Sequence, residues 1–274
     1  MSADIRTPST AADPLFDLTR PELLVLWDRL QRLQVDIVFL QELAAYYTSP
    51  GWHASRRVLD MGSGNGHYLQ RLASRFPGKA YLGVDLAPQL VDIARREAAG
   101  PGCRFECIDM FDVGDTHDFV ILRLLLQHLP DIDGALDKLA RITRPGATAL
   151  VIDSNDAVRF FHPPLPEVMQ LFSHYTTQQA GEGRDRRAAQ LVIDKLVAHP
   201  EWRLGATWQI TAPSTLPGNL DTFRQIYTDI IELLGLVGQL PCDFAALRQA
   251  WAAWCADAAA YTQVGVSIVR LERV

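Results

Sequence analysis

The chain has 274 residues, of which 21% are charged, and a formal net charge of -6. This length fits one large globular domain with a substantial cap, and the negative charge disfavours a nucleic-acid binder, which would ordinarily present a basic face. No apolar run approaches the roughly 20 residues that span a bilayer. The four cysteines lack CxxC spacing, and we see no secretory signal ahead of them. We therefore expect a cytoplasmic protein without membrane, metal or nucleic-acid partners.

Residues 1–50 are expected to form a loose tail followed by lid helices. The first 14 residues are rich in Ser, Thr, Ala and Pro, as chain ends without fixed structure often are. From Pro21 to Tyr47, apolar residues recur every three or four positions, which predicts one or two helices. Ser49-Pro50-Gly51 ends this pattern.

Strands and helices alternate regularly between residues 57 and 152. The strands are near-continuous apolar runs and the helices are amphipathic, a combination typical of a parallel sheet covered by helices on both faces. The predicted strands cover residues 57–61, 80–84, 104–108, 118–123 and 147–152, and the predicted helices cover 66–76, 88–99 and 132–143.

The regular alternation ends after Asp153. Two further strands are predicted at 206–211 and 264–271, which makes a Rossmann-like, mostly parallel sheet of seven strands. Helical insertions are predicted at about 157–200 and 215–262 within a domain that covers 51–274. Because loops of this length usually carry structure or function, we interpret them as a helical cap.

A glycine-rich loop follows the first predicted strand, in the segment VLDMGSGNGHY of residues 58–68. Asp60 closes the strand, and Gly62, Gly64 and Gly66 allow a tight turn and a close approach of the backbone to a ligand. The helix that follows offers free N–H groups. The spacing differs from the G-x-G-x-x-G of a dinucleotide site, so the loop alone indicates a nucleotide-like ligand without identifying it.

Acidic residues end the next two predicted strands. Asp85 could accept hydrogen bonds from both hydroxyls of a ribose, or it could cap the helix that begins at Pro88. Asp109 could accept from an exocyclic amine, with Met110 and Phe111 as apolar neighbours of a purine, or it could be a simple turn residue.

The ordered motifs VLDMGSGNG, GVD, IDMFD, LLQHLPD and RPGA, between residues 58 and 153, resemble those of the class I S-adenosylmethionine-dependent methyltransferases that act on small molecules. The last motif departs slightly from the family's Lys/Arg-Pro-Gly-Gly, a difference in turn preference. The resemblance implies the Rossmann-like fold, S-adenosyl-L-methionine as cofactor, and methyl transfer as the activity.

The resemblance also implies roles for single residues. Asp60 and the glycine loop would face the methionine end of the cofactor, Asp85 would hold the ribose, and Asp109 would take the adenine amine with Met110 packed on the ring. The implied cofactor-binding set is Asp60, Gly62, Ser63, Gly64, Gly66, Asp85, Leu86, Asp109, Met110 and Arg123.

The candidate catalytic residues are Arg123, His128 and Asn155. The resemblance places Arg123 and Leu124 on the methyl-transfer face, and His128, on the following loop, would either pack as scaffold or reach the active site. Asn155 follows the fifth strand, where ligands of such sheets bind, and could orient an acceptor or belong to a polar turn. The basic residues at 184, 186 and 187 suggest a solvated helix start.

The favoured function is transfer of a methyl group to an N, O or C atom of a small molecule, by in-line displacement in a closed pocket. Residues 123–126, RLLL, stand where base methyltransferases carry Asn/Asp-Pro-Pro-Tyr, which disfavours a nucleobase acceptor. A protein acceptor, or cofactor binding without methylation, remains an alternative. The apolar N-terminal helix and the Trp-bearing insertion could equally serve the interface of a homodimer.

Overall fold

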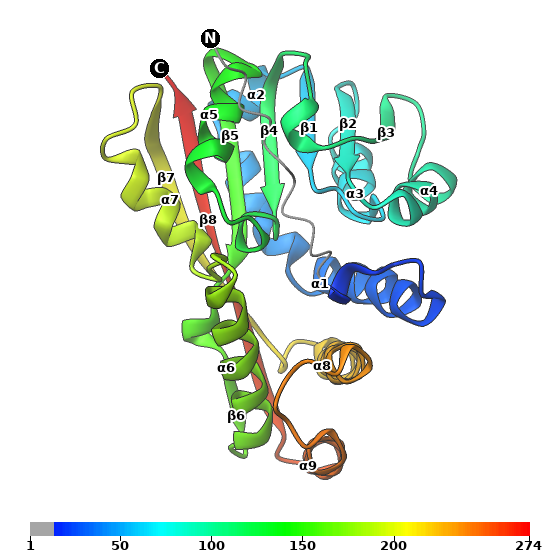
Figure 1. The fold of residues 1–274 in the computed structure, drawn as a ribbon. Coiled ribbons are helices and arrows are strands. Elements are labelled where there is room, and N and C mark those ends of the chain that lie inside the picture. The colour runs from blue at the N-terminus through cyan, green and yellow to red at the C-terminus, as the bar shows by residue number, and fades with distance from the viewer. Residues whose placement is uncertain (1–13) are drawn as a thin grey trace, which may run out of the picture.

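The computed structural model describes residues 14–274 (Figure 1), so the predicted tail lies, but for Pro14, outside the described residues. One sheet runs through this part of the chain in the order β3-β2-β1-β4-β5-β8-β6, with β7 paired to β8. The strands are β1 (Arg57–Met61), β2 (Ala80–Asp85), β3 (Cys103–Cys107), β4 (His117–Arg123), β5 (Thr143–Ser154), β6 (Phe160–His162), β7 (Trp202–Pro213) and β8 (Tyr261–Arg273).

Helices connect and cover these strands. They are α1 (Pro21–Tyr47), α2 (Pro50–Ala54), α3 (His67–Arg75), α4 (Pro88–Glu97), α5 (Ile132–Arg141), α6 (Pro166–Gly181), α7 (Ala188–Leu196), α8 (Asn219–Val237) and α9 (Phe244–Ala256). Short 3-10 turns lie at Pro14–Phe16, Met110–Asp112, Leu126–His128 and Asp156–Val158. None of the helices in residues 14–274 combines the length and apolar character that crossing a bilayer requires.

The central strands of the sheet, β1, β2, β4 and β5, are buried on both faces because they are largely apolar. β1 pairs in parallel with β2 and β4, and β4 pairs in parallel with β5. Successive side chains point to opposite faces, so Val58 packs with α1, α2, α3 and α4, whereas Leu59 packs with α5 and α7. The predicted α/β fold with helices on both faces is therefore confirmed (Figure 1).

The sheet differs from the prediction in two details. The structure has one strand more than predicted, β6, which pairs with the start of β8. Its three residues are too short a run for a periodic pattern to reveal. The predicted Arg144-Pro145-Gly146 turn is instead part of β5, where the register with β4 shifts and Gly146 has a φ of +87°. The segment is a bulged strand start rather than a separate turn.

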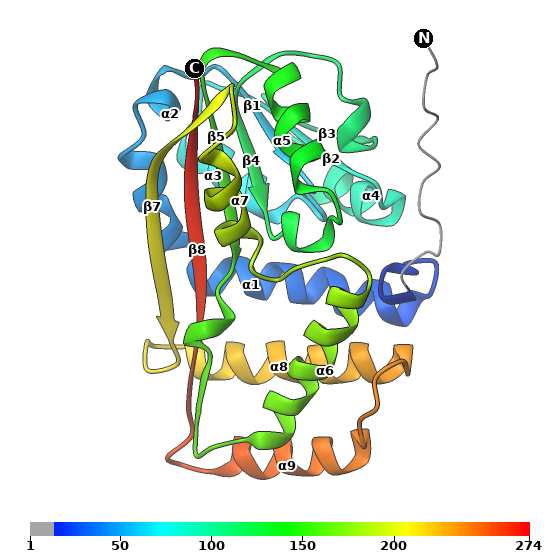
Figure 2. The same cartoon turned by 60° about the vertical axis from the view of Figure 1, so that its left-hand side comes forward.

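The cap is built from α6, α8 and α9 beyond the carboxyl ends of the parallel strands. In Figure 2, α1 and α8 run side by side between the sheet and α9. Helix α1 belongs to both parts, since Leu23 and Leu30 lie in the apolar core of the cap whereas Phe39 and Tyr46 pack against the sheet. A division of the chain at residue 50 stays a prediction, but α1 physically joins the two parts.

Candidate active site

A cavity of about 340 Å³ lies where the parallel sheet meets the cap. Its walls come from the glycine loop after β1, the ends of β2 and β4, the segment after β5, and the facing sides of α1, α6 and α8. This is the carboxyl edge of the sheet, where ligands of doubly wound folds bind, and the volume is in the range of small-molecule sites.

Eight of the predicted site residues line this cavity and four do not. The lining residues are Asp60, Gly62, Ser63, Gly64, Asp85, Arg123, His128 and Asn155. The four that lie elsewhere are Gly66, Leu86, Asp109 and Met110. Among residues 14–274, no three His, Cys, Asp or Glu side chains are grouped so that they could hold a metal ion.

The glycine loop needs its glycines for backbone conformation and for space. Gly62 and Gly64 have φ angles of +72° and +52°, which few other residues adopt. The amide of Gly62 donates to the carbonyl of Val84 at 2.8 Å, and a Cβ at Gly62 would lie 2.8 Å from Leu125 Cδ1. Gly66 instead packs against Phe105 at the start of α3, so its role here is helix–strand packing.

Asp85 organises the loop from the end of β2. One carboxylate oxygen accepts the Gly64 amide at 2.9 Å, and the other accepts the Ala87 amide at 2.8 Å. Burial raises the pKa of this carboxyl, and the backbone hydrogen bonds oppose that shift. Its side chain thus holds the turn before α4 and also faces the cavity, where its remaining lone pairs could meet a ligand hydroxyl.

Asp60 is the most unusual group of the site. Its side chain is buried, and its Oδ1 has no hydrogen-bond partner among residues 14–274. Burial raises the pKa of Asp60 to about 8, although nearby Arg123 acts in the opposite direction. A buried oxygen without a partner is costly. It faces a cavity from which an ammonium or hydroxyl group of a ligand could supply the missing hydrogen bond.

The two residues predicted to hold an adenine, Asp109 and Met110, lie away from the cavity, as does Leu86 of the predicted cofactor-binding set. Asp109 accepts the amide of Phe111 at 2.9 Å and caps the 3-10 turn that follows, which is the turn role weighed as its alternative. Met110 is buried in the core beneath α5. Leu86 is 66% exposed. A role for these residues toward a purine stays a prediction.

Arg123 forms a buried ion pair that joins the sheet to α1. Its Nε lies 3.1 Å from Oε1 of Glu42, which is fully buried, and its Nη2 donates to the Gln34 carbonyl. The guanidinium also stacks over the ring of Tyr68 at 4.7 Å. The following Leu124 has a φ of +53°, a strained conformation of the kind that clusters at functional sites.

His128 and Asn155, the other two candidate catalytic residues, differ in their local contacts. His128 lines the cavity with its ring edge-on to Phe16, at 5.3 Å between centroids. Asn155 donates from Nδ2 to Gln209 at 2.7 Å, and its Oδ1 accepts the Ala157 amide at the start of a 3-10 turn. The geometry of Asn155 therefore agrees with the polar-turn alternative, although the residue borders the cavity.

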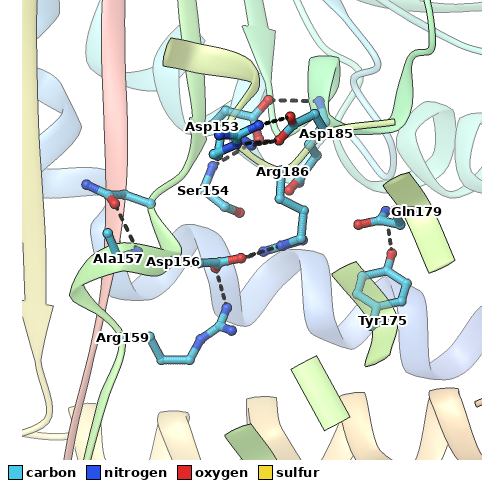
Figure 3. Close-up of polar contacts among 12 residues, drawn as sticks. Asp153, Ser154, Asp156, Ala157, Arg159, Tyr175, Gln179, Asp185 and Arg186 are labelled. Atoms are coloured by element: carbon cyan, nitrogen blue, oxygen red, sulfur yellow. Dashed lines mark hydrogen bonds and ion pairs between the residues drawn. The ribbon is translucent and has the colours of Figure 1, made fainter. Parts of the chain in front are cut away.

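Two functional candidates at the cap end were missed or misplaced by sequence reasoning. Arg159 gave no signal, and Arg186 was assigned to a solvated helix start, yet their side chains are only 9% and 12% exposed. Both contact Asp156 on the cavity wall (Figure 3). The solvated reading holds for the adjacent Arg187, whose side chain is 78% exposed.

The sequence of the sheet core matches a known domain family. Residues 58–146 match the model of a methyltransferase domain. The chain is 32% identical over 127 residues to a trans-aconitate 2-methyltransferase from Methylobacterium nodulans, a match that covers 46% of this chain and 48% of that protein. It is 32% identical over 99 residues to a malonyl-[acyl-carrier protein] O-methyltransferase from Serratia marcescens, covering 36% and 38% respectively. The matches span about half the length of these curated relatives, or less.

The fold resembles that of a solved methyltransferase over nearly the whole chain. The plantazolicin methyltransferase BpumL, solved in complex with SAH, superposes with a TM-score of 0.54 over 93% of both chains at 13% identity. The cavity fits the cofactor of this fold, since an orphaned carboxylate oxygen and a glycine cradle face it. Residues 58–146 therefore match a methyltransferase domain, in a chain whose fold resembles that of a solved methyltransferase.

Proposed function

We propose that this protein transfers a methyl group from S-adenosyl-L-methionine to a small-molecule acceptor, with an oxygen atom as the favoured target. The observation that carries the proposal is the single cavity that has the glycine loop, Asp60 and Asp85 on one wall and an apolar cap opposite. The relatives act, by their names, on trans-aconitate and on a malonyl carrier protein. The predicted N- and C-directed reactions remain alternatives.

The chain's own residues have mainly a binding and positioning task. Bound S-adenosylmethionine supplies an activated methyl group on a sulfonium. Asp60 and the glycine loop are proposed to hold its amino-acid end and Asp85 its ribose. Helix α1 closes one side of the cavity and so excludes water. An acceptor held by the cap opposite needs correct alignment more than it needs a base, because an ionised oxygen is already nucleophilic.

The three candidate catalytic residues receive different proposed roles. His128 is proposed to border the reacting atoms, since its ring lies on the cavity wall. Arg123 is proposed as a positioning residue, because its guanidinium is engaged with Glu42. Asn155 is proposed to shape the loop after β5. The expected cytoplasmic location, the absence of a nucleic-acid partner and the homodimer stay predictions.

Calorimetry tests the cofactor first. Wild-type protein should bind S-adenosylmethionine and its demethylated product, S-adenosylhomocysteine; a folded protein that binds neither would overturn the proposal. Isotopically labelled donor should then deliver label to members of a panel of carboxylic acids, phenols and amines of similar size. Tight cofactor binding without transfer to any of them would favour the alternative of a protein that binds the cofactor without methylating.

A further inference from the structure

A second charged group lies in the cavity, at the end formed by the cap. Asp156 stands between two arginines (Figure 3). Its Oδ1 lies 2.5 Å from Arg159 Nη2, and its Oδ2 lies 2.5 Å from Arg186 Nε, with a further contact of 3.1 Å from Arg186 Nη2 to Oδ1. All three residues line the cavity.

The group has an excess of positive charge. Burial works against ionisation of Asp156, but Arg186 and Arg159 outweigh it and lower the pKa of this carboxyl, so Asp156 is charged at neutral pH. The nearby Asp153 accepts the amides of Ser154 and Gln127, and burial raises its pKa to about 7. Two guanidinium groups therefore face one fully ionised carboxylate and the Asp153 carboxyl, which is about half ionised at neutral pH, so an excess of positive charge of less than one unit remains.

Arg159 also has an unused hydrogen-bond donor. Its side chain is 9% exposed, and its Nε is buried without a short hydrogen bond to residues 14–274, although the Tyr227 hydroxyl, also buried without one, lies near this guanidinium. The guanidinium carbon lies over the ring of Phe172, 3.6 Å from the ring centroid, and this contact holds the group in place beside the cavity. A buried N–H of a cation that lacks an acceptor is unfavourable, and an oxygen of a bound ligand could satisfy it.

The surroundings limit the chemical class of such a ligand. Apart from this group, the cap wall is formed largely by apolar side chains, among them Phe172, Ile226, Ile230 and Leu233. The guanidinium fork matches the two oxygens of a carboxylate. Because the excess of positive charge is at most one unit, a monoanion balances it, whereas a phosphate dianion would leave a buried negative charge unpaired.

We propose that the acceptor is an apolar carboxylic acid whose carboxylate is bound by Arg159 and Arg186 at the cap end of the cavity. The proposal deepens the proposed function and rests on it only in treating this ligand as the acceptor. Carboxylate binding itself can be measured without any methyl transfer.

The test compares ligands that share one apolar body. Hexanoate, hexan-1-ol and hexyl phosphate are titrated into protein saturated with S-adenosylhomocysteine, with calorimetry and saturation-transfer NMR as readouts. Hexanoate should bind about ten- to a hundredfold more tightly than hexanol, the effect expected of hydrogen bonds to a charged group. Equal binding of the acid and the alcohol, tighter binding of the phosphate, or no binding of hexanoate to folded protein overturns the proposal.

Variants separate ligand binding from structural support. Arg159→Met and Arg186→Met should weaken hexanoate binding about tenfold or more, whereas Arg187→Met, the exposed neighbour, should not change it. Asp156→Asn frees both guanidinium groups, so it should strengthen hexanoate binding even though it lowers the melting temperature. A purely structural ion pair predicts no gain in affinity, and that result would overturn the proposal.

Affinity for S-adenosylhomocysteine, measured on the same samples, reports on folding and on the proposed function. It should be unchanged in all four variants. If wild-type protein binds hexanoate but no S-adenosylhomocysteine, the methyltransferase proposal fails while the carboxylate site stands. If it binds S-adenosylhomocysteine but does not discriminate hexanoate from hexanol, only the carboxylate site fails.

Discussion

The two ends of the cavity are built by different means. The end at the sheet is acidic and is shaped by backbone, with the positive φ angles of the glycine loop and the hydrogen bonds from the loop and the α4 turn to Asp85. The end at the cap is basic and is shaped by side chains, as Arg159 and Arg186 converge on Asp156 from separate segments. The sheet end suits the proposed cofactor, which would be the same in all relatives. The cap end suits the proposed acceptor, which would differ between them.

Helix α1 connects these ends, and its buried ion pair with β4 should give the largest effect. Glu42→Leu or Arg123→Met alone leaves one buried charge without its partner, which should lower the free energy of unfolding by about 3–5 kcal/mol. The double variant should recover most of that loss, since neither charge then remains. Urea unfolding of the three variants measures this.

An exposed ion pair in the cap provides the matched control. Glu232 and Arg248 join α8 to α9 with side chains that are 39% and 45% exposed. Glu232→Leu should cost no more than about 1 kcal/mol, because solvent screens such pairs. Equal losses at the two pairs would show that α1 is not anchored through Arg123, and the description of α1 as the connection would have to be abandoned.

Asp85→Ala should give the next largest effect, and only at the sheet end. The substitution removes the acceptor of the Gly64 and Ala87 amides as well as the proposed ribose contact. Affinity for S-adenosylhomocysteine should fall about a hundredfold, as expected for the loss of charged hydrogen bonds worth up to about 3 kcal/mol. Calorimetry measures this, and hexanoate binding at the cap end should persist.

Asp109→Ala is the informative companion of that variant. Because Asp109 lies off the cavity and caps a 3-10 turn, its loss should cost stability but change cofactor affinity less than about threefold. A large loss of affinity would instead support the adenine role that the resemblance implies, and it would mean that this segment moves when the cofactor binds.

The contrast between the ends explains what the sequence could predict. The glycine loop and the strand-end carboxylates are set by local rules, namely a strand, a turn that needs positive φ, and a helix, so Asp60, Gly62 and Asp85 were placed on the cavity from the sequence. The predicted strands agree with β1 to β5, β7 and β8, apart from their ends.

Sequence reasoning failed where tertiary contacts decide the outcome. Arg186 and Arg187 are neighbours in one basic run, and nothing in the run shows that one is buried against Asp156 while the other is in solvent. Arg159 is likewise buried by tertiary contacts, among them Phe172, which α6 places against its guanidinium. Asp109 was assigned by analogy, although its own sequence context, a polar residue before a short turn, favoured the capping role.

The pH dependence of stability should separate Asp60 from the other titrating groups. Because its folded pKa, about 8, is above the unfolded value of about 3.9, the folded state holds a proton that the unfolded state has lost. Unfolding free energy should therefore fall as pH rises toward 8, with a slope of up to about 1.4 kcal/mol per pH unit, and level off above it.

Between pH 7 and pH 8, comparison with Asp60→Asn separates this carboxyl from other groups whose pKa burial raises, among them Asp85 and Cys103. Asp153, with a pKa of about 7, contributes the same sign of slope mainly at lower pH, and His67 and His117 have lowered pKa values and so are neutral there in both states. Urea unfolding of ligand-free wild-type protein and Asp60→Asn at several pH values measures the effect. A wild-type slope that persists unchanged in Asp60→Asn would mean that another group titrates.

Gln31→Ala should give a small effect and shows how tightly α1 closes the sheet end. The side-chain Oε1 of Gln31 accepts the backbone amide of Asn65 at 2.9 Å and lies where a side chain on Gly64 would project. Losing one such hydrogen bond should lower the unfolding free energy by about 0.5–1.5 kcal/mol. Because Asn65 still donates its side-chain amide to Asp28, the loop should keep its shape, and S-adenosylhomocysteine affinity should change by less than about tenfold. Hexanoate affinity should not change, since Gln31 lies at the sheet end. Loss of affinity for both hexanoate and S-adenosylhomocysteine would show that α1 moves as one body and that the two halves of the cavity open together.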